Sequence, residues 1–233
     1  MEHVQKWSKF FFPIHTLFLF SCCVYLQYAL EDATKHKLTL HMPVSSTESI
    51  IHWYNFYTCQ VLHIDAAHLW NNMSLLLSLG LILEALHGSL CALGIFWIGG
   101  TTGTMLEVGW WSGPQIRLSG ASAGIYALVA AYFSHLVINW KETPLRKVWA
   151  IYLVIGTVYT IVYYYMYRAS HEIAHLAHIG GAIQGFLVGC VVVRNVRVTR
   201  LENLWKFVCF LLSSGFIASV SYRLTLKKCE HIS

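Results

Sequence analysis

The sequence predicts an all-α polytopic membrane protein, a bundle of seven candidate transmembrane helices, the last of which is C-terminal. Three observations support this fold class. First, 56% of the 233 residues are hydrophobic, and the mean hydropathy is +0.53. Second, only 12% are charged, whereas a typical soluble domain has about 25%. Third, several apolar runs reach the roughly 20 residues that span a bilayer. No linker rich in Pro, Gly or Ser divides the chain, so a single bundle is favoured.

Seven apolar segments are candidate helices. They lie near residues 10–30, 64–86, 89–109, 121–140, 145–167, 173–193 and 205–224. The polar stretch at about 31–62 is too long for a tight turn and suits a partly ordered loop or interfacial helices. These segments predict a short N-terminal segment (1–9), a main transmembrane domain (10–195), and a final part with a linker, the seventh helix and a short tail (196–233).

The basic residues predict the orientation of these helices. With the N-terminus in the cytosol, the connecting segments on the far side carry few basic residues: Lys35, Lys37, Arg117 and Arg168. The cytosolic side carries more: Lys6, Lys9, Lys141, Arg146, Lys147, Arg194, Arg197, Arg200 and Lys206. This asymmetry follows the positive-inside rule. It also accounts for the net charge of +5 without a nucleic-acid partner.

The cysteines show no paired spacing, and the N-terminus is not a convincing signal peptide. Most of the seven cysteines lie in apolar segments and are typical of small hydrophobic residues. Cys59 and Cys229 fall outside those segments and could pair, although their spacing does not decide it. The apolar run from Phe10 to Leu30 is long for a signal peptide and lacks a clear cleavage site.

A serine and a histidine in separate membrane segments are the main candidates for chemistry. Ser122 lies between Gly120 and Gly124, and His178 precedes Gly181 and Gly185. Small residues let helices approach closely. Polar residues in hydrocarbon mark a functional site by default. A hydroxyl beside an imidazole is the minimum for nucleophilic catalysis, although serine and glycine alone are also common at helix contacts.

His68 and Asn72 strengthen the catalytic interpretation. They begin the second predicted helix one turn apart, at a membrane depth similar to that of Ser122 and His178. Their donors, with the Ser122 backbone N–H, could form an oxyanion hole. Interhelical hydrogen bonding is the plainer explanation. His63 is a weaker supporting candidate. Tyr126 is another, because it follows Ser122 by one turn and its ring could stack on the His178 imidazole.

Two other motifs suggest different chemistry from this pair. Gly-x-Ser-x-Gly also occurs in the nucleophile elbow of soluble hydrolases, but no strand precedes Ser122. His171-Glu172-x-x-His175 matches a zinc-binding helix with a glutamate base. A catalytic zinc needs a third protein ligand. His178 could be that ligand, but it could not then act as a base for Ser122. The plainer explanation of His171 and Glu172 is a polar loop at the start of the sixth helix.

Taken together, these motifs resemble those of the rhomboid intramembrane serine proteases over about residues 50–195. The matching elements are His63, His68-x-x-x-Asn72, Glu84-x-x-x-Gly88, Gly120-Ala-Ser122 with Tyr126, and Ala177-His178-x-x-Gly181-x-x-x-Gly185. The additional C-terminal helix is similar to the six-plus-one arrangement of eukaryotic secretory-pathway rhomboids. The sequence departs from the family pattern at two sites: Ala123 replaces the glycine after the nucleophile, and Tyr54-Asn55 replaces a Trp-Arg pair.

The resemblance implies an intramembrane serine endopeptidase with a Ser122–His178 dyad, in which 10–195 is the catalytic domain. Its expected substrates are single-pass transmembrane proteins, and it would reside in the bilayer of the secretory pathway or plasma membrane. The mechanism requires no metal or organic cofactor. A non-proteolytic protein that binds membrane clients is the alternative. A channel or transporter is disfavoured, because no internal repeat is evident.

Overall fold

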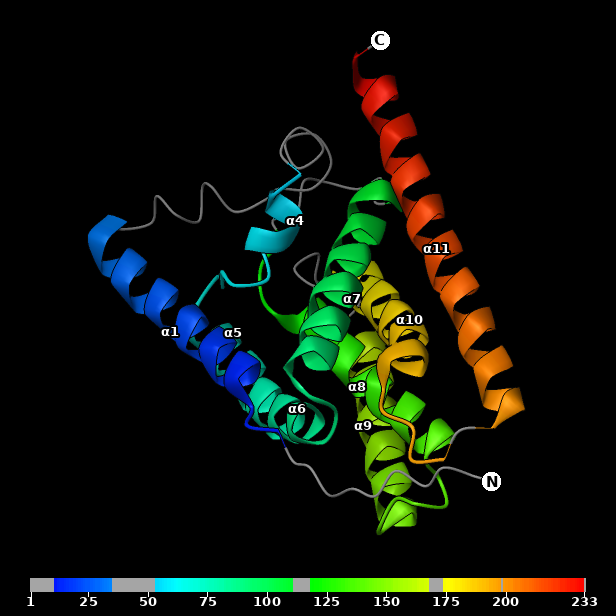
Figure 1. The fold of residues 1–233 in the computed structure, drawn as a ribbon. Helices are drawn as coiled ribbons and strands as arrows, with labels where there is room; N and C mark the ends of the chain where they lie inside the picture. The colour runs from blue at the N-terminus through cyan, green and yellow to red at the C-terminus, as the bar shows by residue number, and fades with distance from the viewer. Residues whose placement is uncertain (1–10, 35–52, 111–117, 168–173, 198, 233) are drawn as a thin grey trace.

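The computed structural model describes residues 11–34, 53–110, 118–167, 174–197 and 199–232, and every regular element within them is helical (Figure 1). In chain order the elements are α1 (Ile14–Thr34), α4 (Asn55–Thr58), α5 (Ala66–Leu75), the π-helical turn η1 (Leu76–Gly80), α6 (Leu81–His87), α7 (Ser89–Trp110), α8 (Ser122–Ile138), α9 (Arg146–Tyr167), α10 (His175–Val192) and α11 (Arg200–Ile232). Each of the seven predicted segments contains a helix, with α5, η1 and α6 forming one continuous run.

Four helices in the described residues are long and apolar enough to cross a membrane. They are Ala66–His87, Ser89–Trp110, His175–Val192 and Arg200–Glu230. Ile14–Ala29 and Ser122–Ile138 are apolar but shorter. The chain is therefore an integral membrane protein with several candidate spans, and four of the seven predicted segments form helices long and apolar enough to cross a membrane.

The largest departure from the predicted boundaries is α11, which begins at Arg200 and continues to Ile232. Thr199 and Glu202 explain the earlier start. The Thr199 N–H donates to Glu202 Oε2 at 2.6 Å, and the Glu202 N–H donates to Thr199 Oγ1 at 3.3 Å. This reciprocal pair is a capping box. Hydropathy locates only the apolar middle of such a helix, so its polar ends were missed.

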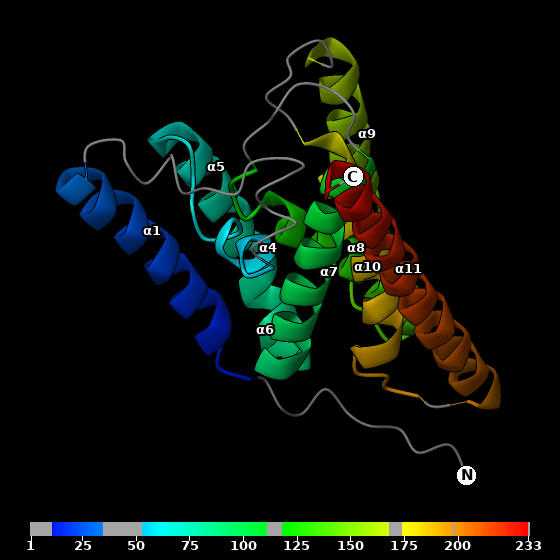
Figure 2. The same cartoon turned by 90° about the horizontal axis from the view of Figure 1, so that it is seen from above.

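Helices α7, α8 and α10 form the centre of the bundle (Figures 1 and 2). Their backbones approach closely because glycines lie at the contacts. A side chain at Gly185 would collide with the backbone of Ala127, and one at Gly181 would collide with the carbonyl of Ala123. Close helix approach through small residues is typical of membrane bundles. The same contacts hold the start of α8 beside the start of α10.

Helix α1 joins the bundle through the buried carboxylate of Glu84. Glu84 accepts the backbone N–H groups of His15 and Thr16, each at 2.7 Å, and the Ser89 hydroxyl at 2.5 Å. The first N–H groups of a helix lack partners within the helix. A carboxylate from another helix therefore satisfies the start of α1 and fixes it against α6 and α7.

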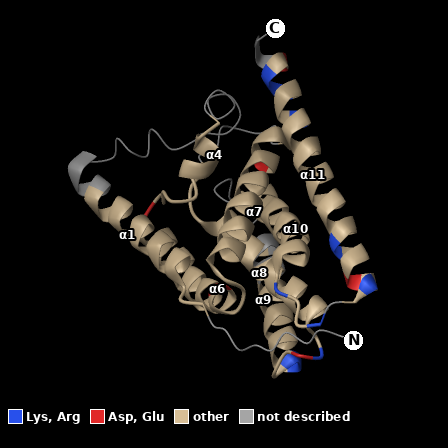
Figure 3. Ribbon diagram, viewed as in Figure 1, with Lys and Arg blue, Asp and Glu red and all other residues tan. Residues whose placement is uncertain are grey.

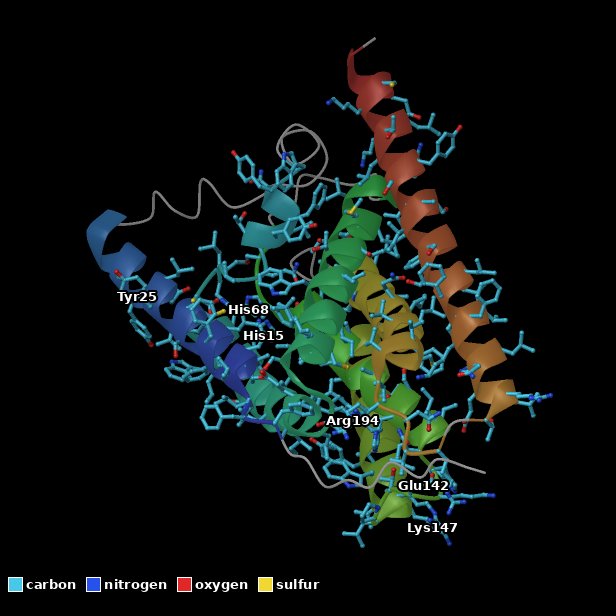
Figure 4. All side chains as sticks on the ribbon, viewed as in Figure 1. His15, Tyr25, His68, Glu142, Lys147 and Arg194 are labelled. Carbon is cyan, nitrogen blue, oxygen red and sulfur yellow. The ribbon has the colours of Figure 1, made fainter. Side chains whose placement is uncertain are left out.

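Lys and Arg gather toward the ends of the helices rather than along their apolar middles (Figure 3). Figure 4 places Glu142, Lys147 and Arg194 toward one end of the bundle, away from His68. At that end Glu142 pairs with Arg197 at 3.1 Å. This distribution agrees with helices that cross a membrane and carry charge at its surfaces.

All seven cysteines are free, so the Cys59–Cys229 pair considered from the sequence is not formed in the structure. Cys59 is buried, and Cys229 is exposed on the last turns of α11.

Candidate active site

Ser122 is the first residue of α8, and hydrogen bonds fix the short backbone segment that precedes it. Gly120 has a φ of +104°, which favours glycine, and its N–H donates to the carbonyl of Cys59 at 2.8 Å. The Ala121 N–H points at His63 Nε2, 3.4 Å away. Because α8 begins at Ser122, the Ser122 backbone N–H is among the first-turn donors that lack a partner within the helix.

His178 lies in the first turn of α10 and faces Ser122. Its Nε2 is 2.8 Å from Ser122 Oγ, although the two residues are 56 positions apart in the chain. The Tyr126 ring stacks on the imidazole with ring centroids 4.4 Å apart and an angle of 20° between the planes. The stacking restricts rotation of the imidazole. A carboxylate is therefore not the only means of orienting this histidine.

His68 and Asn72 project from α5 toward the backbone of Gly120. A Cβ at Gly120 would lie 2.8 Å from His68 Nε2 and 2.9 Å from Asn72 Nδ2. Asn72 is buried, and its Nδ2 has no hydrogen-bond partner in the described part of the chain. A buried donor without a partner costs free energy. Such a donor, beside Gly120 and so close to a residue that precedes Ser122 by two positions, could stabilise a negative oxygen if Ser122 acts as a nucleophile.

His63 supports this group from the segment that precedes α5. Its ring lies edge-on to that of His68, with centroids 5.3 Å apart. Burial, together with the neighbouring His68, lowers the pKa of His63 to about 3. The ring is therefore neutral at physiological pH, which leaves Nε2 able to accept the Ala121 N–H. Asp65 caps α5 by accepting the His68 N–H at 2.7 Å.

Gly120, Gly124, Gly181 and Gly185, which the sequence assigned to helix packing, all lie at close contacts. Gly124 lies under the ring of Phe96, where a Cβ would be 2.5 Å from Cε2. Gly120 differs from the others because a Cβ there would meet the polar side chains of His68 and Asn72, whereas the others face the Phe96 ring or a neighbouring helix backbone.

Sequence reasoning missed Glu107, which lies in α7 and is only 1% exposed. Its carboxylate accepts the Ala177 N–H at 3.0 Å, next to His178. A signal was present, because a carboxylate within an apolar segment is costly and marks a functional or structural partner.

The zinc alternative cannot be assembled from the described residues. His171 and Glu172 lie outside them, whereas His175 begins α10. Among the described residues, no group of three His, Cys, Asp or Glu side chains is arranged to hold a metal ion. The zinc site stays an untested alternative.

The fold and this group of residues define a class: a polytopic helical membrane protein with a serine and a histidine in contact between two helices. A profile of the rhomboid domain matches residues 51–195. The chain therefore belongs to the rhomboid family. The match begins near α4 and ends just after α10, so it contains every residue of the candidate site.

Three relatives illustrate the relationship. Rhomboid-related protein 1 of Caenorhabditis elegans is 33% identical over 173 residues, which are 71% of this chain and 47% of the relative. Rhomboid-related protein 2 of Mus musculus is 25% identical over 193 residues, 77% of this chain and 63% of the relative. Inactive rhomboid-related protein 2 of Caenorhabditis elegans is 21% identical over 217 residues, 88% of this chain and 62% of the relative. This chain thus spans about half to two thirds of the length of these relatives.

Proposed function

We propose that this protein is an intramembrane serine endopeptidase that cleaves transmembrane segments of single-pass membrane proteins. The observation that carries the proposal is the 2.8 Å contact between Ser122 Oγ and His178 Nε2, with Tyr126 stacked on the imidazole. A nucleophile within hydrogen-bond reach of a base that a third group orients is the general signature of nucleophilic catalysis. The extra helix α11 is compatible with the six-plus-one type.

The chemistry follows in two steps. His178 Nε2 takes the proton of Ser122 as Oγ attacks the substrate carbonyl carbon, and the imidazolium then protonates the leaving amine as the C–N bond breaks. Water, activated by the same imidazole, hydrolyses the acyl-enzyme and restores Ser122. In both steps the carbonyl oxygen becomes negative, and Asn72 Nδ2, His68 and the Ser122 N–H are the proposed donors.

The substrate and the membrane orientation are part of the proposal. A substrate helix must unwind locally, because its carbonyls are otherwise hydrogen-bonded within the helix. The charge asymmetry supports a cytosolic N-terminus, which would open the site to the non-cytosolic side in the secretory pathway or at the plasma membrane.

Binding of membrane clients without cleavage is the second candidate, because an inactive rhomboid-related protein is among the relatives. The two are separated by incubating the purified full chain in detergent with a model transmembrane substrate, beside Ser122→Ala. We expect wild type alone to cleave, and a chelator to leave cleavage unchanged. Binding without any cleavage would support the client-binding function. Loss of cleavage on chelation, with recovery on adding zinc, would support the metalloprotease alternative.

A further inference from the structure

The last turns of α7 lie between α10, which carries His178, and the seventh helix, α11. On the α10 side, Glu107 accepts the Ala177 N–H at 3.0 Å. The N-cap residue of α10 is Ala174, whose side chain makes no capping hydrogen bond. The first N–H groups of a helix need partners from elsewhere. Glu107 therefore supplies from α7 a cap that α10 does not have, at the residue before His178.

On the α11 side, Lys227 reaches the same turn of α7. Its Nζ donates to the carbonyl of Val108 at 2.6 Å, and Val108 directly follows Glu107. The last four carbonyls of a helix lack partners within it, and α7 ends at Trp110. Lys227 is only 7% exposed. Burying an ammonium group is costly unless it is hydrogen-bonded, so this contact holds α11 against the end of α7.

An apolar cluster joins the same elements independently of these hydrogen bonds. Val108 of α7 and Leu224 of α11 pack in one buried group with Phe56 and Leu118. Leu118 precedes Ser122 by four positions, and Ala174, which packs against the cluster, precedes His178 by four positions. A side chain at Gly109 would also contact Arg223 and Leu224 of α11. The end of α7 thus connects α11 to the segments leading into both members of the dyad.

We propose that Glu107 is a positioning residue for His178, and that Lys227 of α11 holds the turn of α7 that carries it. The seventh helix is then part of the support of the active site rather than an appendage to it. This inference rests on the proposed proteolytic function. Its physical basis is that catalysis depends on the Oγ–Nε2 geometry, where a misplacement of about 1 Å can cost roughly 10²-fold in rate.

The test uses the full chain in detergent with Glu107→Gln, Lys227→Met and the control Lys228→Met, whose lysine is the exposed neighbour of Lys227. Gln keeps the shape of Glu107 but removes its charge. After thermal stability is checked, kcat and KM are measured on one transmembrane substrate. We expect Glu107→Gln to lower kcat by about tenfold or more, and Lys227→Met by a smaller factor, with KM little changed, because a positioning defect acts on the transition state. Lys228→Met should match wild type.

A second readout does not depend on activity. Hydrogen exchange at the first turn of α10 should accelerate in Glu107→Gln, because a neutral amide oxygen is a weaker acceptor for the Ala177 N–H than a carboxylate. It should accelerate less in Lys227→Met, in which the carboxylate remains but the turn that carries it becomes more mobile. The proposal would be overturned if Glu107→Gln folds and keeps the wild-type kcat. It would also be overturned if Lys227→Met has the same kcat as Lys228→Met. If Glu107→Gln does not fold, Lys227→Met decides. Absence of cleavage by wild type would refute the proteolytic function alone, and the exchange rates would then decide the positioning role.

Discussion

At the residue scale, the candidate site is built on contacts that fix the backbone of the two residues before Ser122. The Gly120 N–H donates to the Cys59 carbonyl, and the Ala121 N–H donates to His63 Nε2. A side chain at Gly120 would occupy the space in front of His68 and Asn72. The glycine therefore serves two purposes: it permits the positive φ, and it avoids the collision that a Cβ would make with the His68 and Asn72 side chains.

The first residue-scale prediction concerns the dyad. We expect Ser122→Ala and His178→Ala each to abolish measurable cleavage, because proton transfer and attack require both groups at once. For the same reason, the double variant should be no worse than either single variant. Cleavage rates of the three purified proteins on one substrate provide the test. Substantial activity in Ser122→Ala would exclude the serine mechanism.

The second residue-scale prediction concerns the proposed oxyanion donors. Asn72→Ala and His68→Ala should lower kcat more than they change KM, because the negative oxygen exists only during the reaction. Loss of one such donor typically costs about 10²–10³ in rate, and the Ser122 N–H would moderate that loss. The measurement is kcat and KM on a detergent-solubilised substrate, with thermal stability as the control. Unchanged kcat in both variants would make these residues packing groups.

The sequence predicted several of these residue contacts but not others. Ser122 with His178, and Tyr126 with His178, followed from helical spacing and the alternation of helix direction. Glu107 could not be paired with Ala177 in this way, because the two lie 70 positions apart. Its partner is a backbone group that carries no sequence signal. The position of a carboxylate within an apolar segment was informative, but its target requires the packed bundle.

At the element scale, the contact between α8 and α10 depends on the absence of side chains at its glycines. We expect Gly185→Ala to destabilise the protein by about 1–3 kcal/mol, because the new Cβ would collide with the backbone of Ala127. Gly94→Ala is the matched control: it also lies in a helix, but nothing is within 4 Å of its would-be Cβ. Thermal unfolding in detergent measures both. Equal melting temperatures would show that α8 can move away from α10 at little cost.

The helices were predictable as elements because each apolar run is long, whereas their interruptions and ends were not. The π-helical turn at Leu76–Gly80 lies within one apolar run, so hydropathy cannot separate it from α5 and α6. α4 is a helix of four residues in the polar stretch before α5, where no apolar period marks it. The start of α11 depends on the capping residues Thr199 and Glu202, which are visible in the sequence but identify a helix start only once the helix is placed.

At the scale of the whole molecule, orientation follows from charge and from the number of spans. An odd number of crossings puts the two ends of the chain on opposite sides of the membrane. If all seven predicted segments cross the membrane and the N-terminus is cytosolic, as proposed, α11 ends on the non-cytosolic side, together with the Ser122–His178 pair. The basic residues between α8 and α9 and between α10 and α11 favour this arrangement.

Cys229 provides a direct test of this orientation. It is exposed near the end of α11, whereas Cys22 is half-buried and the other five cysteines are buried. In sealed microsomes, whose outer face is cytosolic, we expect a membrane-impermeant maleimide to leave Cys229 unlabelled until detergent opens the vesicles. Cys229→Ser should abolish the labelling that detergent exposes, which assigns the signal to this thiol. Efficient labelling in intact vesicles would place the C-terminus in the cytosol. With an odd number of crossings, the N-terminus and the opening of the active site would then change sides as well.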